Sequence, residues 1–424
     1  MYAFERKTMG KNLKQSAVLK NLTNGARDTV GYFYDELRLI LSDSGTILIF
    51  IIAMFIYPVL YSVGYMNETL REIPIAVVDL DHTSTSRQFS RMTDASEQLK
   101  VVYKPSSLKE AEDLFYDGLV HGIILIPDHF EKDILSGKQV RPSVYCDASY
   151  FLLYKQVYSG AVFSSGTFSA GVEIKKMLAE GKTLEQAKVL QEPLQVKNYY
   201  LYNPSGGYDS FVMPGMILII IQQTLLIGIG MLGGTIREKK IFLKMNAPVT
   251  KLWGTSKMIF GKASAYVLIY LFNALFAMVV LHKWLALPDK GTLLGVISLL
   301  IPYLLAISFL GLAISMLFKE RVHSLLFMVF ISPIVMFLSG ISWPTSSIPP
   351  ALYWFSHIFP STFMIPAYLR LRIMGASLES VHYEWAFLLI QMVVYFFLAC
   401  FSYKIAIKRY GKNIGSNSES TNKV

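Results

Sequence analysis

The chain first becomes continuously hydrophobic at residues 45–66, which read GTILIFIIAMFIYPVLYSVGYM and contain no charged side chain. This length matches the roughly 20 apolar residues that a helix needs to cross a bilayer. A mostly polar stretch, 67–210, follows. Five more runs without Asp, Glu, Lys or Arg then occupy Phe211–Ile236, Ala263–Leu281, Gly291–Phe318, Val322–Trp343 and Ala386–Tyr403. The pattern predicts an α-helical polytopic membrane protein with six transmembrane helices.

Composition and the placement of charge agree with this class. Of the 424 residues, 53% are hydrophobic and only 17% are charged. Basic residues outnumber acidic ones in residues 1–44, in 237–257 and from Lys404 onward, whereas acidic residues are in excess in 67–210. Because basic segments stay in the cytoplasm, both termini are expected there and 67–210 outside. The basic segments that give the net charge of +10 are then expected to bind anionic lipid headgroups, and no nucleic-acid partner is expected.

The chain divides into four predicted parts. Residues 1–44 form a cytoplasmic N-terminus, with an amphipathic interfacial helix over 27–43. Residues 45–66 are the first transmembrane helix. Residues 67–210 form an inserted extracytoplasmic α/β domain between helices 1 and 2. Residues 211–424 hold five further transmembrane helices, a cytoplasmic loop at 237–257 and proline-rich outer re-entrant helices at 343–384.

The extracytoplasmic part alternates short apolar runs with helical patterns, which favours a small mixed domain with a partly parallel sheet. Strands are expected at Ile73–Asp79, Leu99–Tyr103, Gly122–Pro127 and Ser143–Asp147. Asp79, Asp81 and Asp147 lie at the ends of two of these strands and could approach each other, but turn or cap roles are the simplest interpretation of them.

Motifs for catalysis and metal binding are not found in the sequence. No G-x-x-x-x-G-K-[ST] or H-E-x-x-H occurs, and the seven histidines are scattered, so no catalytic residue, metal site or bound cofactor is predicted. Ion-coupled transporters usually place ionisable groups inside the bilayer. The hydrophobic runs offer only mild polarity, such as Gln222 and Gln223, which either line a substrate path or hold helices together. The driving force for transport is therefore expected from a separate ATPase.

Four stretches resemble the ABC-2 type permeases, the membrane subunits of ATP-binding-cassette exporters, in the branch with a large external domain after the first span. They are Asp35–Asp43 with Pro58; Val78–Asp81, Ile124–Phe130 and Val144–Asp147; Tyr202–Pro204, Met213–Gly215 and Ile236–Glu238; and Leu338–Pro344, Ile348–Pro350, Phe359–Ser361 and Arg372–Gly375. The resemblance covers nearly the whole chain from residue 27. It implies an exporter in the bacterial cytoplasmic membrane that moves a bulky, partly hydrophobic substrate outward.

The resemblance also implies partners. A separate ATPase subunit would use ATP and Mg, a membrane-fusion adaptor would continue the export path, and a second permease copy would complete the cavity. After Arg237-Glu238 the family usually has a Gly-Thr step, which this chain lacks, so a heterodimer with a sister permease is equally open.

Site residues follow from the same resemblance. The second and fifth spans would line the substrate path, with a plug at its outer end; the candidates are Gln222, Gln223, Leu226, Val329, Ser332, Met336, Phe337 and Leu338. Val329, Ser332 and Met336 share one helical face by their spacing, which equally suits packing against a neighbouring span. The candidates for ATPase coupling are Glu36, Arg237, Glu238, Lys239, Lys240 and Pro248. The alternatives are a receptor or assembly scaffold acting through the external domain, and a membrane-embedded enzyme.

Overall fold

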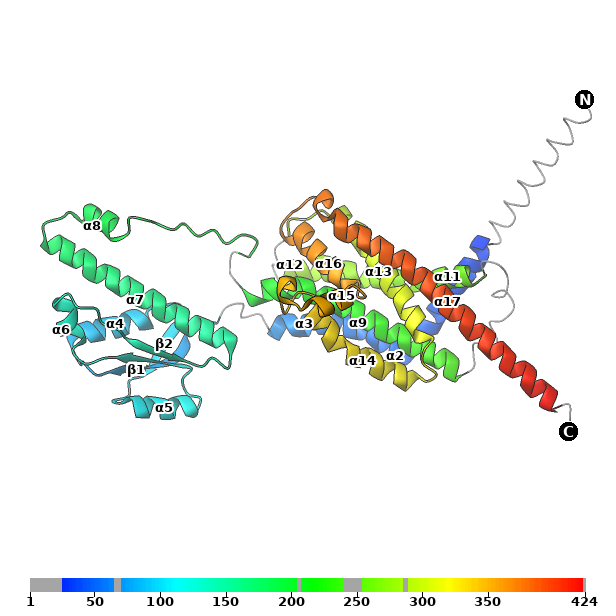
Figure 1. The fold of residues 1–424 in the computed structure, drawn as a ribbon, viewed down its shortest axis with the longest axis horizontal. Helices are drawn as coiled ribbons and strands as arrows, with labels where there is room; N and C mark the ends of the chain where they lie inside the picture. The colour runs from blue at the N-terminus through cyan, green and yellow to red at the C-terminus, as the bar shows by residue number, and fades with distance from the viewer. Residues whose placement is uncertain (1–24, 65–69, 204–206, 240–253, 285–288, 422–424) are drawn as a thin grey trace, which may run out of the picture. The chain divides into compact units, whose positions relative to one another are not determined.

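The structure is a computed structural model that describes residues 25–64, 70–203, 207–239, 254–284 and 289–421 (Figure 1). The chain divides into two compact units. The helical unit comprises Met1–Met66 with Leu201–Val424, and the sheet unit comprises Asn67–Tyr200.

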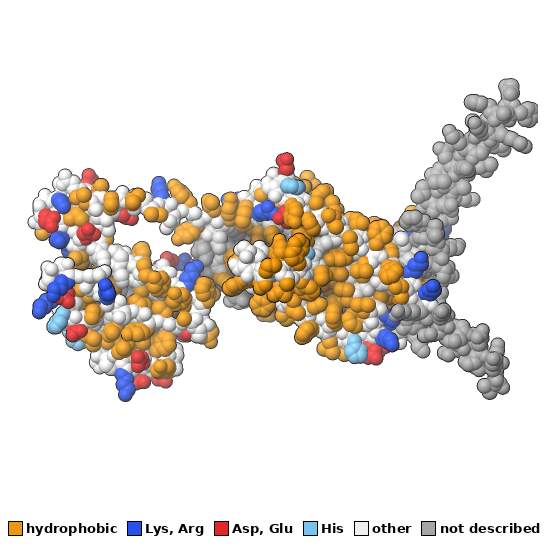
Figure 2. Space-filling view, in the orientation of Figure 1, with side chains coloured by type: hydrophobic (Ala, Val, Ile, Leu, Met, Phe, Trp, Pro, Cys, Tyr) orange, Lys and Arg blue, Asp and Glu red, His pale blue; other side chains and the backbone are white. Residues whose placement is uncertain are grey.

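Within its described residues, the helical unit contains six helices that are long and apolar enough to cross a membrane, which confirms that part of the prediction. They are Ser44–Gly64 (α2, Ser44–Ile47; η1, Leu48–Ala53; α3, Met54–Gly64), Tyr208–Glu238 (α9), Gly254–Trp284 (α11, Gly254–Phe276; η3, Ala277–Leu281; α12, His282–Trp284), Leu293–Ser315 (α13), Arg321–Leu338 (α14) and Leu378–Lys408 (η6, Leu378–Val381; start of α17, His382–Thr421). Hydrophobic side chains cover most of the visible face of this unit, and charged ones gather near its ends (Figure 2).

Helix α9 is the central element of the helical unit. Nearly all of its most apolar stretch is buried inside the chain, and it packs against α3, α13 and α14 (Figure 1). Small residues permit this close approach: a Cβ added at Gly228 would lie 1.9 Å from the Phe50 ring. Helix α9 is therefore surrounded by protein, whereas the other spans expose an apolar face.

Two boundaries differ from the sequence prediction. Helix α11 begins at Gly254, nine residues before the predicted run, and so carries Lys262 within the helix. Helix α14 ends at Leu338, where the predicted run continued to Trp343. Gly340 has φ of 85°, in the left-handed region that commonly ends a helix, so the chain turns there.

The proline-rich segment forms short helices: η4 (Thr345–Ser347), α15 (Pro350–Ser356), α16 (Ser361–Tyr368) and η5 (Leu369–Ile373). Their prolines sit mostly at or near first turns, where no donor is lost. Helix α16 is almost fully buried and packs against α17, α13 and α9.

The sheet unit has four strands in the order β2-β1-β3-β4. Strand β1 (Ile73–Asp79) runs parallel to β2 (Leu99–Tyr103) and β3 (Gly122–Ile126), and β4 (Ser143–Cys146) is antiparallel to β3. All four lie at the predicted positions. Apolar residues on both faces of β1 and β3 explain why helices cover both sides of the sheet.

Helices α4 (Ser84–Asp94) and α7 (Phe151–Ala179) pack on one face of this sheet, and α5 (Leu108–Tyr116) packs on the other (Figure 1). Phe89, Phe130 and Phe168 meet in the first layer, with ring centroids 5.3–5.8 Å apart. Helix α6 (Phe130–Leu135) and helix α8 (Leu184–Gln191) complete the unit.

Candidate functional site

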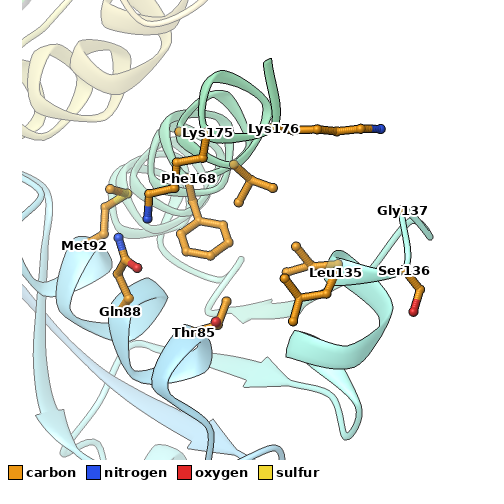
Figure 3. Close-up of a pocket in the computed structure, with 12 residues that line it drawn as sticks. Thr85, Gln88, Met92, Leu135, Ser136, Gly137, Phe168, Lys175 and Lys176 are labelled. Carbon is orange, nitrogen blue, oxygen red and sulfur yellow. The ribbon is translucent and has the colours of Figure 1, made fainter. Parts of the chain in front are cut away.

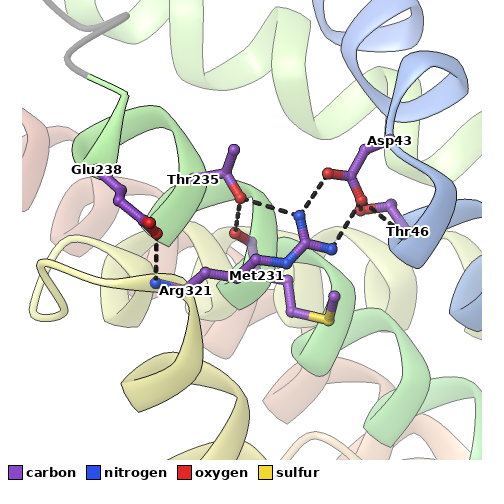
Figure 4. Close-up of polar contacts among 6 residues, drawn as sticks. All are labelled: Asp43, Thr46, Met231, Thr235, Glu238 and Arg321. Atoms are coloured by element: carbon purple, nitrogen blue, oxygen red, sulfur yellow. Dashed lines mark hydrogen bonds and ion pairs between the residues drawn. The ribbon is translucent and has the colours of Figure 1, made fainter.

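A charged junction joins three transmembrane helices at the start of α14. Arg321, the first residue of α14, contacts both carboxylate oxygens of Asp43, with Nη2 2.8 Å from Oδ1 (Figure 4). Its Nη1 also donates to the Thr235 hydroxyl of α9 at 3.1 Å. Its backbone N–H donates to Oε2 of Glu238, the last residue of α9, at 3.4 Å. One guanidinium therefore ties α14 to both the first span and α9.

Asp43 has a second task as the N-cap of α2. Its Oδ1 accepts from the Thr46 amide at 2.8 Å and from the Thr46 hydroxyl at 2.9 Å, which satisfies donors that the first helical turn leaves open. The hydrogen bonds from Arg321 hold the pKa of Asp43 well below its usual range. The carboxylate therefore stays charged across the physiological pH range.

Helices α9 and α14 can meet here only because residue 234 is glycine. A Cβ at Gly234 would lie 2.7 Å from Cα of Arg321 and 2.9 Å from the carbonyl oxygen of Glu320. Backbone atoms cannot move aside as a flexible side chain can. The close approach fixes Arg321 beside Thr235 and Glu238.

A second charged group joins the helix at residues 25–42 to α11. Glu36 accepts from Lys262 Nζ and from the Tyr266 hydroxyl, and Glu36 and Lys262 are each only 3% exposed. An exposed ion pair between Lys257 and Asp28, at 3.3 Å, links the same two helices near their starts. Charges are buried only when they are paired, so this pair fixes the register of the two helices.

The predicted coupling residues fall in two places. Glu36 is buried in the pair with Lys262, so its side chain contacts α11. Arg237, Glu238 and Lys239 lie at the C-terminal end of α9, where Arg237 donates to the carbonyl of Met316 at the end of α13. Lys240 and Pro248 lie outside the described residues.

The predicted path residues do not gather on one open surface of the chain. On α9, Gln222, Gln223 and Leu226 are buried. On α14, Val329 is 49% and Phe337 62% exposed, whereas Ser332 and Met336 are half-buried. Leu338 is buried and packs with Val335 and Phe359.

The two glutamines of α9 differ in their contacts. Gln222 Oε1 accepts from the Ser361 amide at 2.9 Å, and its Nε2 donates to the Ser361 hydroxyl at 3.0 Å. These bonds hold the start of α16 against α9, the helix-joining role that the sequence left open. Within the described part of the chain, neither amide atom of Gln223 has a hydrogen-bond partner. Gln223 is therefore a buried polar group with unused hydrogen-bonding capacity.

The sheet unit has a cleft of about 530 Å³ between α4, α6 and α7. Phe168 and Lys175 of α7 point toward α4, which contributes Thr85, Gln88 and Met92, whereas Lys176 points away (Figure 3). Most of its lining is apolar, and none of it pairs an acid with a base for proton transfer. Among the described residues, no group of three or more His, Cys, Asp or Glu is placed to hold a metal ion.

Sequence reasoning missed Asp43, Thr235, Lys262, Tyr266 and Arg321. The charged members lie one or two residues before a hydrophobic run, where charges commonly flank a membrane span. The available signal was the position of Asp43 and Arg321 at the starts of helices. The hydrophobic runs contain no charged side chain, but the helices extend beyond them: α11 carries Lys262 and α9 carries Asp209, both of which are buried.

Comparison with known proteins identifies the family. A family model described as ABC-2 family transporter protein matches residues 44–401, and the chain therefore belongs to the ABC-2 family of transporter proteins. It is an ABC-2 type permease, the membrane component of an ABC transporter, and its family membership implies association with an ABC ATPase partner. A search of curated proteins found no match.

Proposed function

We propose that the chain is the permease subunit of an ATP-driven exporter that moves a bulky, partly hydrophobic substrate, drug-like or lipid-like, out of the cytoplasm or the inner leaflet. The observation that carries the proposal is the junction in which Arg321 joins Asp43, Thr235 and Glu238. It lies at the end of α9, which includes the first two residues of the segment 237–257 that is proposed to contact the ATPase. A push on this loop would reach the first span and α14 together.

Motion is proposed to pass through charged contacts that keep helices together. Arg237 and Glu238 belong to the last turn of α9. Arg237 contacts the end of α13, and Glu238 contacts the start of α14. The buried Glu36–Lys262 pair would make the helix at 25–42 move with α11. Glu36 would therefore act as a positioning residue, while Lys239, Lys240 and Pro248 would contact the ATPase.

The substrate path is proposed to form when α9 and α14 move apart. In the arrangement observed, Gln222, Gln223 and Leu226 are covered, and the exposed side of α14 is apolar. Separation would uncover the unpaired Gln223 amide on α9, and Ser332 and Met336 of α14 would line the same path. Val329 and Phe337 would face a second permease copy or a sister permease, and Leu338 would close the outer end.

The setting proposed for this cycle is the bacterial cytoplasmic membrane, with both termini in the cytoplasm and the sheet unit outside. A membrane-fusion adaptor would dock on the sheet unit. The chain would bind no cofactor itself, and ATP and Mg would be used by the partner subunit.

Purification of the full chain from its native membranes tests this proposal. We expect an ABC ATPase to co-purify, and ATP hydrolysis to appear in the complex and not in the separated chain. Labelling of cysteine variants in intact cells tests the orientation: a cysteine in place of Tyr116, which is 82% exposed in the sheet unit, should react with a membrane-impermeant reagent, and one at residue 245 should not. Hydrolysis by the separated chain, or the reverse labelling, would contradict the proposal.

A further inference from the structure

A second cleft of the sheet unit lies at the carboxyl ends of β1 and β2. It measures about 390 Å³ and is lined by Val77 and Asp79 of β1, by His82, Arg87, Ser90 and Arg91 around α4, and by Lys104, Pro105 and Ser106 after β2. In open sheets with parallel strands, ligands bind outside the carboxyl ends of the strands. The size is at the lower end of the roughly 300–1,000 Å³ range of ligand pockets.

The lining of this cleft is basic although the surrounding segment is acidic. Arg87, Arg91 and Lys104 contribute three positive charges against the single carboxylate of Asp79. Residues 67–210 as a whole carry more acidic than basic side chains. A local excess of positive charge in an acidic unit attracts anions, and low-dielectric walls strengthen the attraction.

The charged side chains in the cleft differ in the protein partners that they bind. Asp79 already accepts from the Ser86 hydroxyl at 2.7 Å and from the amides of Asp81 and His82 at 3.1 Å each. Arg87 donates to the His82 carbonyl at 2.7 Å. The exposed side chains of Arg91 and Lys104 form no ion pair or hydrogen bond within the described residues. Two cations of the cleft lining therefore lack a partner in the described part of the chain.

Ser90 provides an independent indication of a ligand. Its side chain is only 5% exposed, it lines the cleft, and its hydroxyl has no hydrogen-bond partner within the described residues. Buried hydroxyl groups are almost always paired. The neighbouring serine on the same helix, Ser86, follows that rule by donating to Asp79.

We propose that this cleft is a binding site for a soluble, compact phosphate-bearing anion of pyrophosphate size. Arg91 and Lys104 would neutralise the phosphate oxygens, since the arginine fork and the lysine ammonium are the usual partners of phosphate. The Ser90 hydroxyl would donate to an oxygen at the base of the cleft. The site belongs to the sheet unit alone and does not depend on the proposed export function.

Binding of inorganic pyrophosphate to the purified full chain in a neutral detergent tests the proposal by calorimetry at constant ionic strength. The variants are Arg91→Gln and Lys104→Gln, which remove exposed cations and should leave the fold intact. Lys188→Gln on α8 is the matched control, because it removes one exposed positive charge from the same unit outside the cleft. Each cleft variant should weaken binding by about 10- to 100-fold, the value expected for a charged hydrogen bond. Ser90→Ala should weaken it by about two- to tenfold.

The control variant should bind pyrophosphate as the wild type does. Absence of binding by the wild-type chain, or equal affinities of Arg91→Gln and Lys188→Gln, would overturn the proposal. Repeating the titration in nanodiscs with and without phosphatidic acid tests the source of the phosphate. Equal affinities support a soluble ligand, and loss of affinity in the acidic nanodiscs would overturn that assignment in favour of a lipid headgroup.

Discussion

The two units of the chain use charge in opposite ways. In the helical unit, Glu36 and Lys262 are buried as a pair although 226 residues separate them. In the sheet unit, carboxylates such as Asp79 bind groups a few residues away, and ion pairs such as Lys100–Glu72 are exposed. Buried charge in the first unit fixes how helices meet, whereas surface charge in the second caps turns. A change of charge should therefore cost much more stability in the helical unit.

Removal of the buried cation should have the largest effect. Lys262→Met leaves Glu36 buried without its partner, which should cost about 3–5 kcal/mol of unfolding free energy. The double variant Glu36→Leu with Lys262→Met should recover most of this loss, because two apolar side chains replace the pair. Denaturant titration of the purified chain in detergent measures both. A single variant as stable as the wild type would show that the pair does not hold the two helices.

One glycine from each unit allows close packing in the two units to be compared. Gly234→Ala places a Cβ against the backbone of Arg321 and should destabilise the chain by about 1–3 kcal/mol. Gly166→Ala on α7 meets no atom within 4 Å and should stabilise the chain by about 0.5–1 kcal/mol, because alanine restricts the unfolded chain. The same titration gives both values. Equal effects at the two positions would contradict the close approach of α9 and α14.

The adjacent glutamines of α9 provide a matched pair within one helix. Gln222→Leu leaves the amide and hydroxyl of Ser361 without their partner and should cost about 1–3 kcal/mol. Gln223→Leu removes an amide without partners and should be neutral or stabilising. Thermal unfolding distinguishes them. If Gln223→Leu proves the more damaging variant, the amide has a partner in the folded chain.

The smallest effect is expected at the surface of the sheet unit. Lys100→Gln breaks an ion pair whose side chains are 55% and 69% exposed. Such exposed pairs contribute about 0–1 kcal/mol, and salt screens them further. The unfolding temperature should stay close to that of the wild type at moderate salt. A loss comparable to that of Lys262→Met would remove the distinction between the two units.

The sequence was sufficient to predict features that depend on local patterns. The four strands from Ile73 to Cys146 and the six candidate membrane spans follow from hydrophobic period and length, and the structure has them there. Two helix boundaries differ from the hydrophobic runs: α11 starts nine residues before its run, and α14 ends two residues before Gly340, which has a positive φ. The contacts of Arg321 with Asp43 could not be predicted, since 278 residues separate them and no single-sequence pattern encodes such a pairing.

The central claim is that the Arg321 junction transmits the work of a separate ATPase to the transmembrane helices. Vesicles that contain the complex, and a fluorescent amphiphile that the wild type exports, allow the number of molecules moved per ATP hydrolysed to be measured. Arg321→Gln should lower this ratio about tenfold or more if the junction supplies at least 1.4 kcal/mol of coupling. As a control, Lys319→Gln removes an exposed cation two residues before Arg321 and should leave the transport-to-hydrolysis ratio unchanged. An unchanged ratio in Arg321→Gln would contradict the account.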